Sequence, residues 1–149
     1  MKKNVTWVLV ADAGHARILY NEGHGRGLHR AFDHDFAAPH TTNKEAETDA
    51  PGRTFDSGGP GRHFKGKEED WQEHEEKSFA KDLAHELNQA ADQGRFDRVV
   101  VVAPDRFLGE LRPNLSGRVS DHIHAEAHKD LTHARIDELE QHLADVMPV

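Results

Sequence analysis

The chain has 149 residues, of which 36% are hydrophobic and 31% charged, with a net charge of −8 and no cysteine. This length predicts one domain, residues 1–149, with an apolar core. The composition excludes disulfides and thiolate chemistry, and no apolar run approaches the ~20 residues of a membrane span. We therefore expect a cytoplasmic protein with no membrane contact, and the negative charge predicts no broad binding to DNA.

The first predicted elements are two strands joined by a tight turn. Residues 5–11 (VTWVLVA) form a nearly continuous apolar run, which is typical of a strand buried on both faces. A turn at residues 12–14 leads into a second strand at residues 15–21, and this short connection predicts a hairpin. Alternation over residues 28–36 predicts a third strand at an edge of the sheet.

Residues 37–70 are polar and rich in glycine, and they predict a long flexible loop. Within it, residues 51–67 (PGRTFDSGGPGRHFKGK), which we call the basic segment, contain five glycines and no Leu, Ile or Val. Four cations face one anion, so the local charge is +3 in a chain of net −8. Glycine adopts positive φ freely and proline lacks a donor, so the segment cannot build a core element. Its charge favours an anionic partner, and the alternative is a disordered linker.

Helical spacing predicts the main helix over residues 71–93. Its apolar stripe consists of Phe79, Leu83, Leu87 and Ala90. The acidic residues at 68–76 are expected to suit the positive end of the helix dipole, and Gly94 is expected to end the helix. Residues 98–103 form a second buried strand, and the strand–helix–strand order predicts a parallel pair.

The remaining elements complete the fold. A short helix begins at residues 104–105, a fifth strand spans residues 118–127, and a final helix is capped by Asp130 or Thr132. Its buried stripe is expected to be Ile136, Leu139, Leu143 and Met147. The order β-β-β-α-β-α-β-α predicts an α/β fold with a mixed five-stranded sheet and helices on its faces. This order is shared with ribonuclease-H-like folds and suggests the strand order 3-2-1-4-5.

Two groups of residues could hold metal ions. His122, His124 and His128 would lie on one face of the predicted fifth strand, where His-x-His can bind a first-row metal. The pattern lacks a usual fourth ligand, so we interpret this face as solvated and predict no metal. A nuclease would need carboxylates such as Asp12, Glu86 and Asp105, but the first and last of these lie beyond strand ends. No P-loop or dinucleotide fingerprint occurs, so we predict no cofactor.

Four stretches together resemble the bacterial host-attachment protein family. They are VADAGHARIL at 10–19, RTFDSGGPGRH at 53–63 with the acidic helix after it, VVVAPDRFLGELR at 100–112 and HKDLTHARIDELEQHL at 128–143. That family is similar in turn to the middle domain of archaeal and eukaryotic class-one translation release factors. In those proteins a Gly-Gly-Gln loop between the third strand and the first long helix promotes hydrolysis of peptidyl-tRNA.

Here the equivalent position holds Gly58, Gly59 and Pro60. Proline lacks the backbone N–H that glutamine supplies, so the resemblance does not predict hydrolysis. It implies a non-catalytic protein that binds the ribosome or tRNA. The glycines would give backbone access, and phosphate contacts would come from Arg53, Arg62, His63, Lys65 and Lys67. The alternatives are a metal-dependent hydrolase or nuclease, and a protein-interaction module using the acidic residues 68–76; the oligomeric state stays open.

Overall fold

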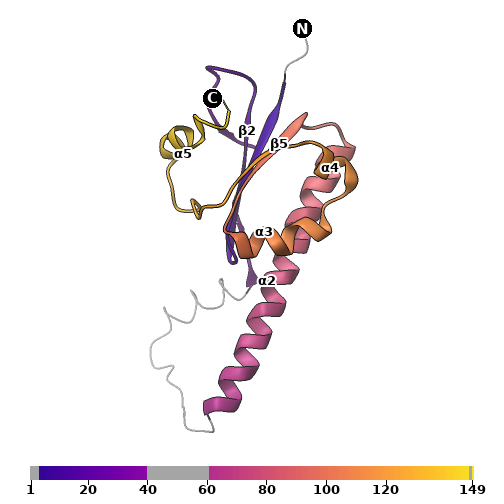
Figure 1. Cartoon of the computed structure of the whole chain (residues 1–149), viewed down its shortest axis with the longest axis vertical. Coiled ribbons are helices and arrows are strands. Elements are labelled where there is room, and N and C mark those ends of the chain that lie inside the picture. The colour runs from indigo at the N-terminus through magenta and orange to yellow at the C-terminus, as the bar shows by residue number, and fades with distance from the viewer. Residues whose placement is uncertain (1–3, 40–60, 148) are drawn as a thin grey trace.

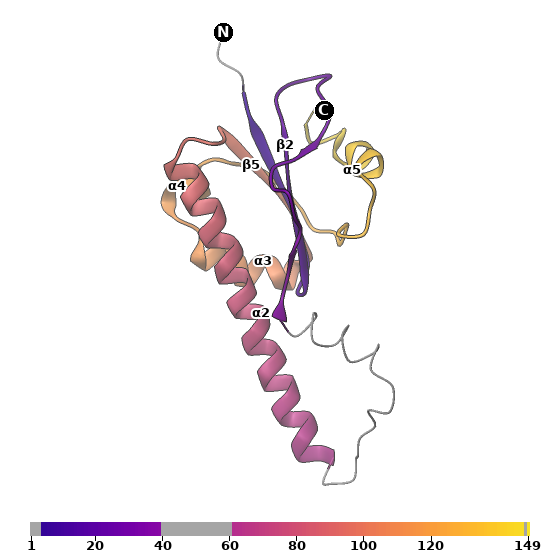
Figure 2. The ribbon, with the colours of Figure 1, turned by 180° about the vertical axis from the view of Figure 1, so that it is seen from behind.

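The fold is a mixed β-sheet with helices on both faces (Figures 1 and 2). It comes from a computed structural model that describes residues 4–39, 61–147 and 149, with no description of the side chains of residues 61–70. The strands are β1 (Thr6–Ala11), β2 (His15–Asn21), β3 (His29–Arg30), β4 (Phe36–Ala37), β5 (Arg98–Val102) and β6 (Ile123–Ala127). The helices are α2 (Gly61–Asp92), α3 (Asp105–Leu111), the 3-10 turn η1 (Arg112–Asn114), α4 (Gly117–Asp121) and α5 (Ile136–Leu143).

Strand β1 lies at the centre of the sheet, as its apolar sequence predicts. All six of its residues are buried. It pairs antiparallel with β2 and parallel with β5, so the predicted hairpin and the predicted parallel pair are both confirmed. Strand β6 adds to β5 in the parallel direction. The order β3-β2-β1-β5-β6 confirms the predicted arrangement of the strands.

The edge beyond β2 differs from the prediction. Instead of one strand over residues 28–36, two strands of two residues, β3 and β4, each pair antiparallel with β2. Phe32 lies between them and packs edge-on against Trp7, with 5.7 Å between the ring centroids. Phe32 packs against the core, and the chain leaves the edge of the sheet at residues 31–35, between β3 and β4. The described part of the chain therefore forms six strands rather than five.

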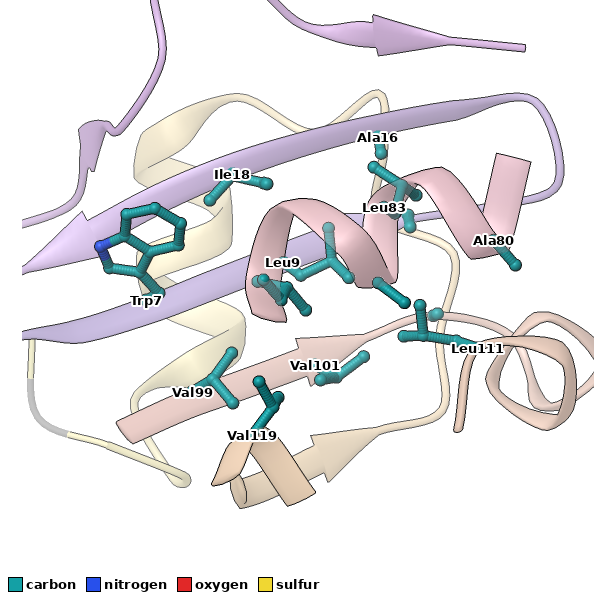
Figure 3. Packing of buried hydrophobic residues seen from close by; sticks show 14 of the residues in the cluster. Trp7, Leu9, Ala16, Ile18, Ala80, Leu83, Val99, Val101, Leu111 and Val119 are labelled. Carbon is teal, nitrogen blue, oxygen red and sulfur yellow. The ribbon is translucent and has the colours of Figure 1, made fainter. Parts of the chain in front are cut away.

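Side chains of the central strands alternate between two cores, because a strand has a period of two residues. Trp7, Leu9 and Val101 face the core that α2, α3 and α4 cover (Figure 3). Val8 and Val100 face the opposite core, which is closed by Leu139, Leu143 and Met147 around α5. Both faces of the sheet are therefore covered, which explains why β1 and β5 carry no polar alternation.

Helix α2 begins at Gly61 rather than at residue 71. The prediction of a loop up to residue 70 is therefore wrong for residues 61–70, while residues 40–60 lie outside the described part. Arg, Lys and Glu, which make up half of residues 61–70, are good helix formers, and lengthening an existing helix adds one hydrogen bond per residue. The acidic residues 68–76 consequently lie beyond the first turn, so the expected dipole benefit is also wrong. The N-terminal half of α2 extends beyond the sheet (Figure 2).

The end of α2 matches the prediction. Gly94 has φ +69°, and its N–H donates to the Ala91 carbonyl at 3.0 Å. The next N–H, from Arg95, donates to the Ala90 carbonyl at 2.9 Å. This left-handed residue with two backward hydrogen bonds is the usual way for a glycine to end a helix.

The predicted strand over residues 118–127 is wrong in its first part. Ser116 caps a short helix, α4, by accepting a hydrogen bond from the Val119 N–H at 3.3 Å. Val119 is the buried residue of this helix. Only residues 123–127 form strand β6. A serine cap explains the difference, because its oxygen satisfies an N–H that a strand would pair with its neighbour.

The stripe predicted for the final helix faces the core: Leu139, Leu143 and Met147 are buried and Ile136 is partly buried. In α3, Phe107, Leu108 and Leu111 are buried. The predicted caps of α5 are wrong, because it begins at Ile136 and the Glu138 carboxylate accepts from the Arg135 N–H at 3.0 Å. None of the helices within the described residues has the length and apolar character that crossing a membrane requires.

Candidate functional site

A pocket lies where three parallel strands end. Strands β1, β5 and β6 run in the same direction, so the segments that follow them meet at one edge of the sheet. In open α/β sheets, ligands bind outside these carboxyl ends. The pocket has a volume of about 450 Å³. Its lining includes residues 12–15 after β1, four residues after β5, and Asp130 and His133 after β6. The four residues after β5 are Pro104, Arg106, Phe107 and Glu110.

Asp12 organises the turn that forms one wall of this pocket. Its Oδ1 accepts hydrogen bonds from the backbone N–H groups of Gly14 at 2.9 Å and His15 at 2.7 Å. Its Oδ2 accepts from the Thr132 hydroxyl at 3.0 Å. Burial raises the pKa of Asp12, but these hydrogen bonds lower it by more, so the pKa lies below its usual value. Asp12 is therefore a turn residue, as predicted, and is ionised at neutral pH.

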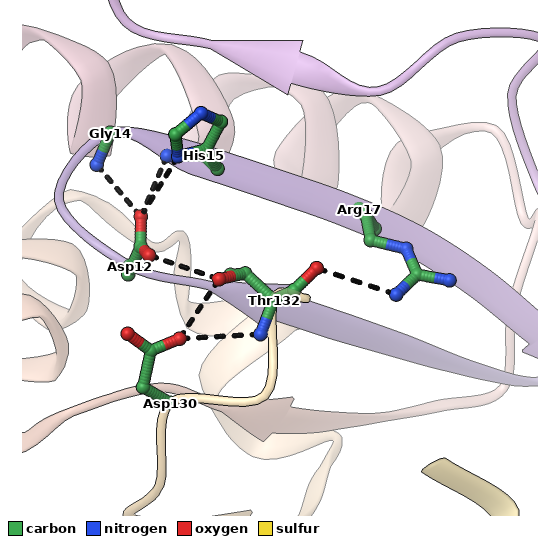
Figure 4. A network of polar contacts seen from close by, with 6 residues as sticks. All are labelled: Asp12, Gly14, His15, Arg17, Asp130 and Thr132. Atoms are coloured by element: carbon green, nitrogen blue, oxygen red, sulfur yellow. Dashed lines mark hydrogen bonds and ion pairs between the residues drawn. The ribbon is translucent and has the colours of Figure 1, made fainter. Parts of the chain in front are cut away.

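Thr132 ties the segment after β6 to this turn (Figure 4). Its hydroxyl also lies 2.9 Å from Asp130 Oδ1, and its N–H donates to the same oxygen at 3.2 Å. Arg17 of β2 donates to the backbone carbonyls of Thr132 and Ala134. Residues 120 positions apart in the chain are thereby held together.

Two histidines complete a cluster with Asp12. The rings of His15 and His133 lie 5.6 Å apart between centroids, and His15 Nδ1 lies 3.7 Å from Asp12 Oδ1. One ligand atom from each of the three residues lies within 4.8 Å of the other two. Asp12 and His15 are partly buried, and His133 is exposed. Two imidazoles and a carboxylate can serve as acid, base or metal ligands.

The pocket is predominantly acidic. Its carboxylates are Asp12, Glu76, Glu110 and Asp130, and Arg106 is the arginine in the lining. Arg106 pairs with Glu76 at 3.4 Å. Burial, together with the neighbouring Glu76 charge, raises the pKa of Glu110 above its usual value. The pocket therefore favours a cation over an anionic ligand such as phosphate.

The site residues predicted in the polar insert lie elsewhere. Arg53, Gly58, Gly59 and Pro60 fall outside the described residues. Arg62, His63, Lys65 and Lys67 lie on the first turns of α2. The start of this helix is far from the sheet (Figure 1). The described end of the basic segment, residues 61–67, therefore contributes no residue to the acidic pocket.

The three histidines weighed as metal ligands have separate partners. His122 follows α4 rather than lying in a strand, and its ring contacts the Arg118 carbonyl at 2.6 Å. His124 contacts Arg98 and the Val146 carbonyl, whereas His128 pairs with Asp105 and Glu126. Within the described residues, the one group of three possible ligands is Asp12, His15 and His133. Among these described residues, His122, His124 and His128 do not form a group of possible metal ligands, and neither do Asp12, Glu86 and Asp105.

Sequence pattern alone does not single out His15 and His133 as site residues, and it assigns Thr132 only a capping role. No local pattern links positions 15 and 133. A signal was nevertheless present in the predicted elements. His15 follows the hairpin turn after the first strand, and His133 follows the last strand of the parallel part of the sheet. Segments that follow the carboxyl ends of parallel strands converge at one edge of the sheet, so polar side chains in them are candidates for a shared site.

One family of proteins and one solved structure are similar to this chain. The sequence model of a family described as "Protein required for attachment to host cells" matches residues 7–143. Among solved structures, an archaeal translation termination factor is similar, with a TM-score of 0.44 and 15% sequence identity. The match covers 91% of this chain and 33% of that factor, so the chain spans about a third of its length. At this TM-score the likeness identifies no function. No match was found among curated proteins.

Proposed function

The chain belongs to the family of proteins required for attachment to host cells, and we propose that it is a non-catalytic protein that binds ribosomal RNA or tRNA. The basic segment, residues 51–67, would make the contact. The protein would act in the cytoplasm, so its effect on attachment would be indirect.

The observation behind this proposal is the concentration of positive charge. The basic segment carries +3 in a chain of net −8. The protein has a net negative charge and therefore repels RNA as a whole, so contact needs a local basic site separate from the acidic body. The start of α2, which carries the last residues of the segment, extends away from the sheet (Figure 2).

The chemistry of the segment suits phosphates rather than base edges. Arg53, Arg62, Lys65 and Lys67 can each neutralise a phosphate, and Gly58 with Gly59 allows close approach of the backbone. By the resemblance in sequence, the two glycines would correspond to the ribosomal loop of release factors, which is the reason for proposing the ribosome as the partner. Pro60 removes an N–H at that loop, so binding is expected without hydrolysis.

The test is sedimentation of the protein with ribosomes at 50 and 200 mM salt, conditions chosen for the assay. Four phosphate contacts predict that affinity falls by about 50- to 150-fold between these concentrations. A variant with Arg53, Arg62, Lys65 and Lys67 replaced by Ala is expected to lose co-sedimentation even at low salt, because its local attraction is gone.

A matched control separates local charge from net charge. It replaces four exposed cations outside the segment by Ala, namely Arg26, Lys81, Arg118 and Lys129. Both variants have the same net charge, so only the segment variant should lose binding. The proposal fails if wild-type protein does not sediment with ribosomes at low salt, or if the two variants lose binding equally.

A further inference from the structure

We infer that Asp12, His15 and His133 form a binding site for a divalent transition metal ion, for which zinc is the probe. One ligand atom from each residue lies within 4.8 Å of the others, at the wall of a pocket of about 450 Å³. Two histidines and one carboxylate are a frequent donor set for zinc sites that keep an open coordination position. The inference concerns the pocket alone and does not depend on RNA binding by the basic segment.

The candidate ligand atoms lie within 4.8 Å of one another, somewhat farther apart than in a bound site. Tetrahedral zinc with bonds of about 2.0–2.1 Å holds neighbouring ligand atoms roughly 3.4 Å apart. The distance from Asp12 Oδ1 to His15 Nδ1 is 3.7 Å. The third ligand, His133, is exposed, so rotation of its side chain can close the remaining gap without moving the core.

Asp12 is oriented as a metal-binding carboxylate usually is. A carboxylate has about four acceptor positions, and hydrogen bonds from Gly14, His15 and Thr132 occupy three. Oδ1 accepts two of these bonds and Oδ2 accepts one, so the bonds fix the side chain and leave the position for a cation on Oδ2. The Thr132 hydroxyl is the supporting contact, and partners of this kind commonly change metal affinity 10- to 100-fold.

The surroundings favour a cation for a second reason. The Thr132 hydroxyl lies 3.0 Å from Asp12 Oδ2 and 2.9 Å from Asp130 Oδ1, yet it has a single proton to donate. The two carboxylates therefore stand close together with one shared donor. Glu76 and Glu110 add negative charge, opposed by Arg106. A divalent cation at the cluster relieves this repulsion, and three protein ligands leave a fourth position for water or another oxygen ligand.

The test is calorimetric titration of Zn²⁺ into the full chain, without an affinity tag and after removal of metal with EDTA. Wild type is expected to bind one equivalent. His15→Ala and His133→Ala each remove a ligand, and each should weaken binding at least as much as the loss of a supporting contact, about 10- to 100-fold. Thr132→Val should weaken it by about the same factor, because the valine keeps the shape and removes the hydroxyl.

Two exposed histidines outside the pocket serve as matched controls, His85 on α2 and His142 on α5. His85→Ala and His142→Ala should bind zinc as wild type does. Circular dichroism checks that each variant is folded, and zinc at about 100 times its Kd should raise the Tm of wild type by roughly 5–10 °C. The inference is overturned if wild type binds no zinc, or if the pocket variants and the control variants bind it equally.

Discussion

Asp12 holds the turn between β1 and β2, and its replacement measures how much this carboxylate stabilises the fold. Asp12→Ala removes the acceptor of three hydrogen bonds, with lengths of 2.9, 2.7 and 3.0 Å. Asp12→Asn keeps one oxygen for the turn and presents an amide to the Thr132 hydroxyl. A hydrogen bond to a charged group contributes about 1.5–3 kcal/mol, and three bonds to one partly buried carboxylate are not additive.

We therefore expect Asp12→Ala to lower the free energy of unfolding by about 2–4 kcal/mol, and Asp12→Asn by about 1 kcal/mol. For a chain of this size, the alanine variant should lose roughly 4–16 °C in Tm. Urea unfolding followed by circular dichroism measures the difference, with EDTA present so that metal binding contributes nothing. The slope against urea concentration should stay constant, because both variants expose the same surface on unfolding.

The pH dependence gives an independent check. Hydrogen bonding outweighs burial and holds the pKa of Asp12 below its unfolded value. The stabilisation is then fully present above the unfolded pKa of about 3.9, and it is lost as the pH falls through the lower folded pKa. The gap between wild type and Asp12→Ala should thus be largest near neutral pH and shrink in acid. An alanine variant as stable as wild type at pH 7, or a gap that widens in acid, would refute the reasoning.

Two further substitutions test the core and the end of α2. Leu83 is 1% exposed beneath the sheet, so Leu83→Ala should cost about 2–5 kcal/mol in urea unfolding. The exposed Lys81→Ala serves as its control, and a cost below about 1 kcal/mol would contradict a core position for Leu83. Gly94 has φ +69° with no atom within 4 Å of an added Cβ, so Gly94→Ala should cost about 1–2 kcal/mol from the backbone alone. Gly94→Asn should cost less, and a thermal melt showing equal costs would count against the left-handed conformation.

Some features of the fold are visible in short stretches of sequence. The runs at residues 6–11 and 98–102 contain almost no polar side chains, and both lie in the centre of the sheet. A continuous β-branched run has one stable location, a strand covered on both faces, so local composition predicts its place. The buried stripe of α2, with Leu83 and Leu87, follows from helical periodicity for the same reason.

Element boundaries were harder to predict, because competing local interactions are similar in strength. Residues 61–70 lack an apolar stripe, and helix continuation there depends on propensity and on the turns that follow. Around residue 119, a serine cap at Ser116 stabilises a helical turn where alternation suggests a strand. Differences of about 1 kcal/mol decide such cases, and pattern alone does not resolve them.

The sequence by itself determined the two central strands buried on both faces, the apolar stripe of α2 and the concentration of positive charge in the basic segment. Only the tertiary structure decided that Asp12 and His15 meet Thr132 and His133. These pairs are more than 100 positions apart, and their approach requires β1, β5 and β6 to run parallel and end at one edge. Periodicity reports which face a residue occupies, because it arises from neighbours along the chain. Which polar side chains converge depends on how the strands are ordered and directed, and this information is carried by the assembled sheet.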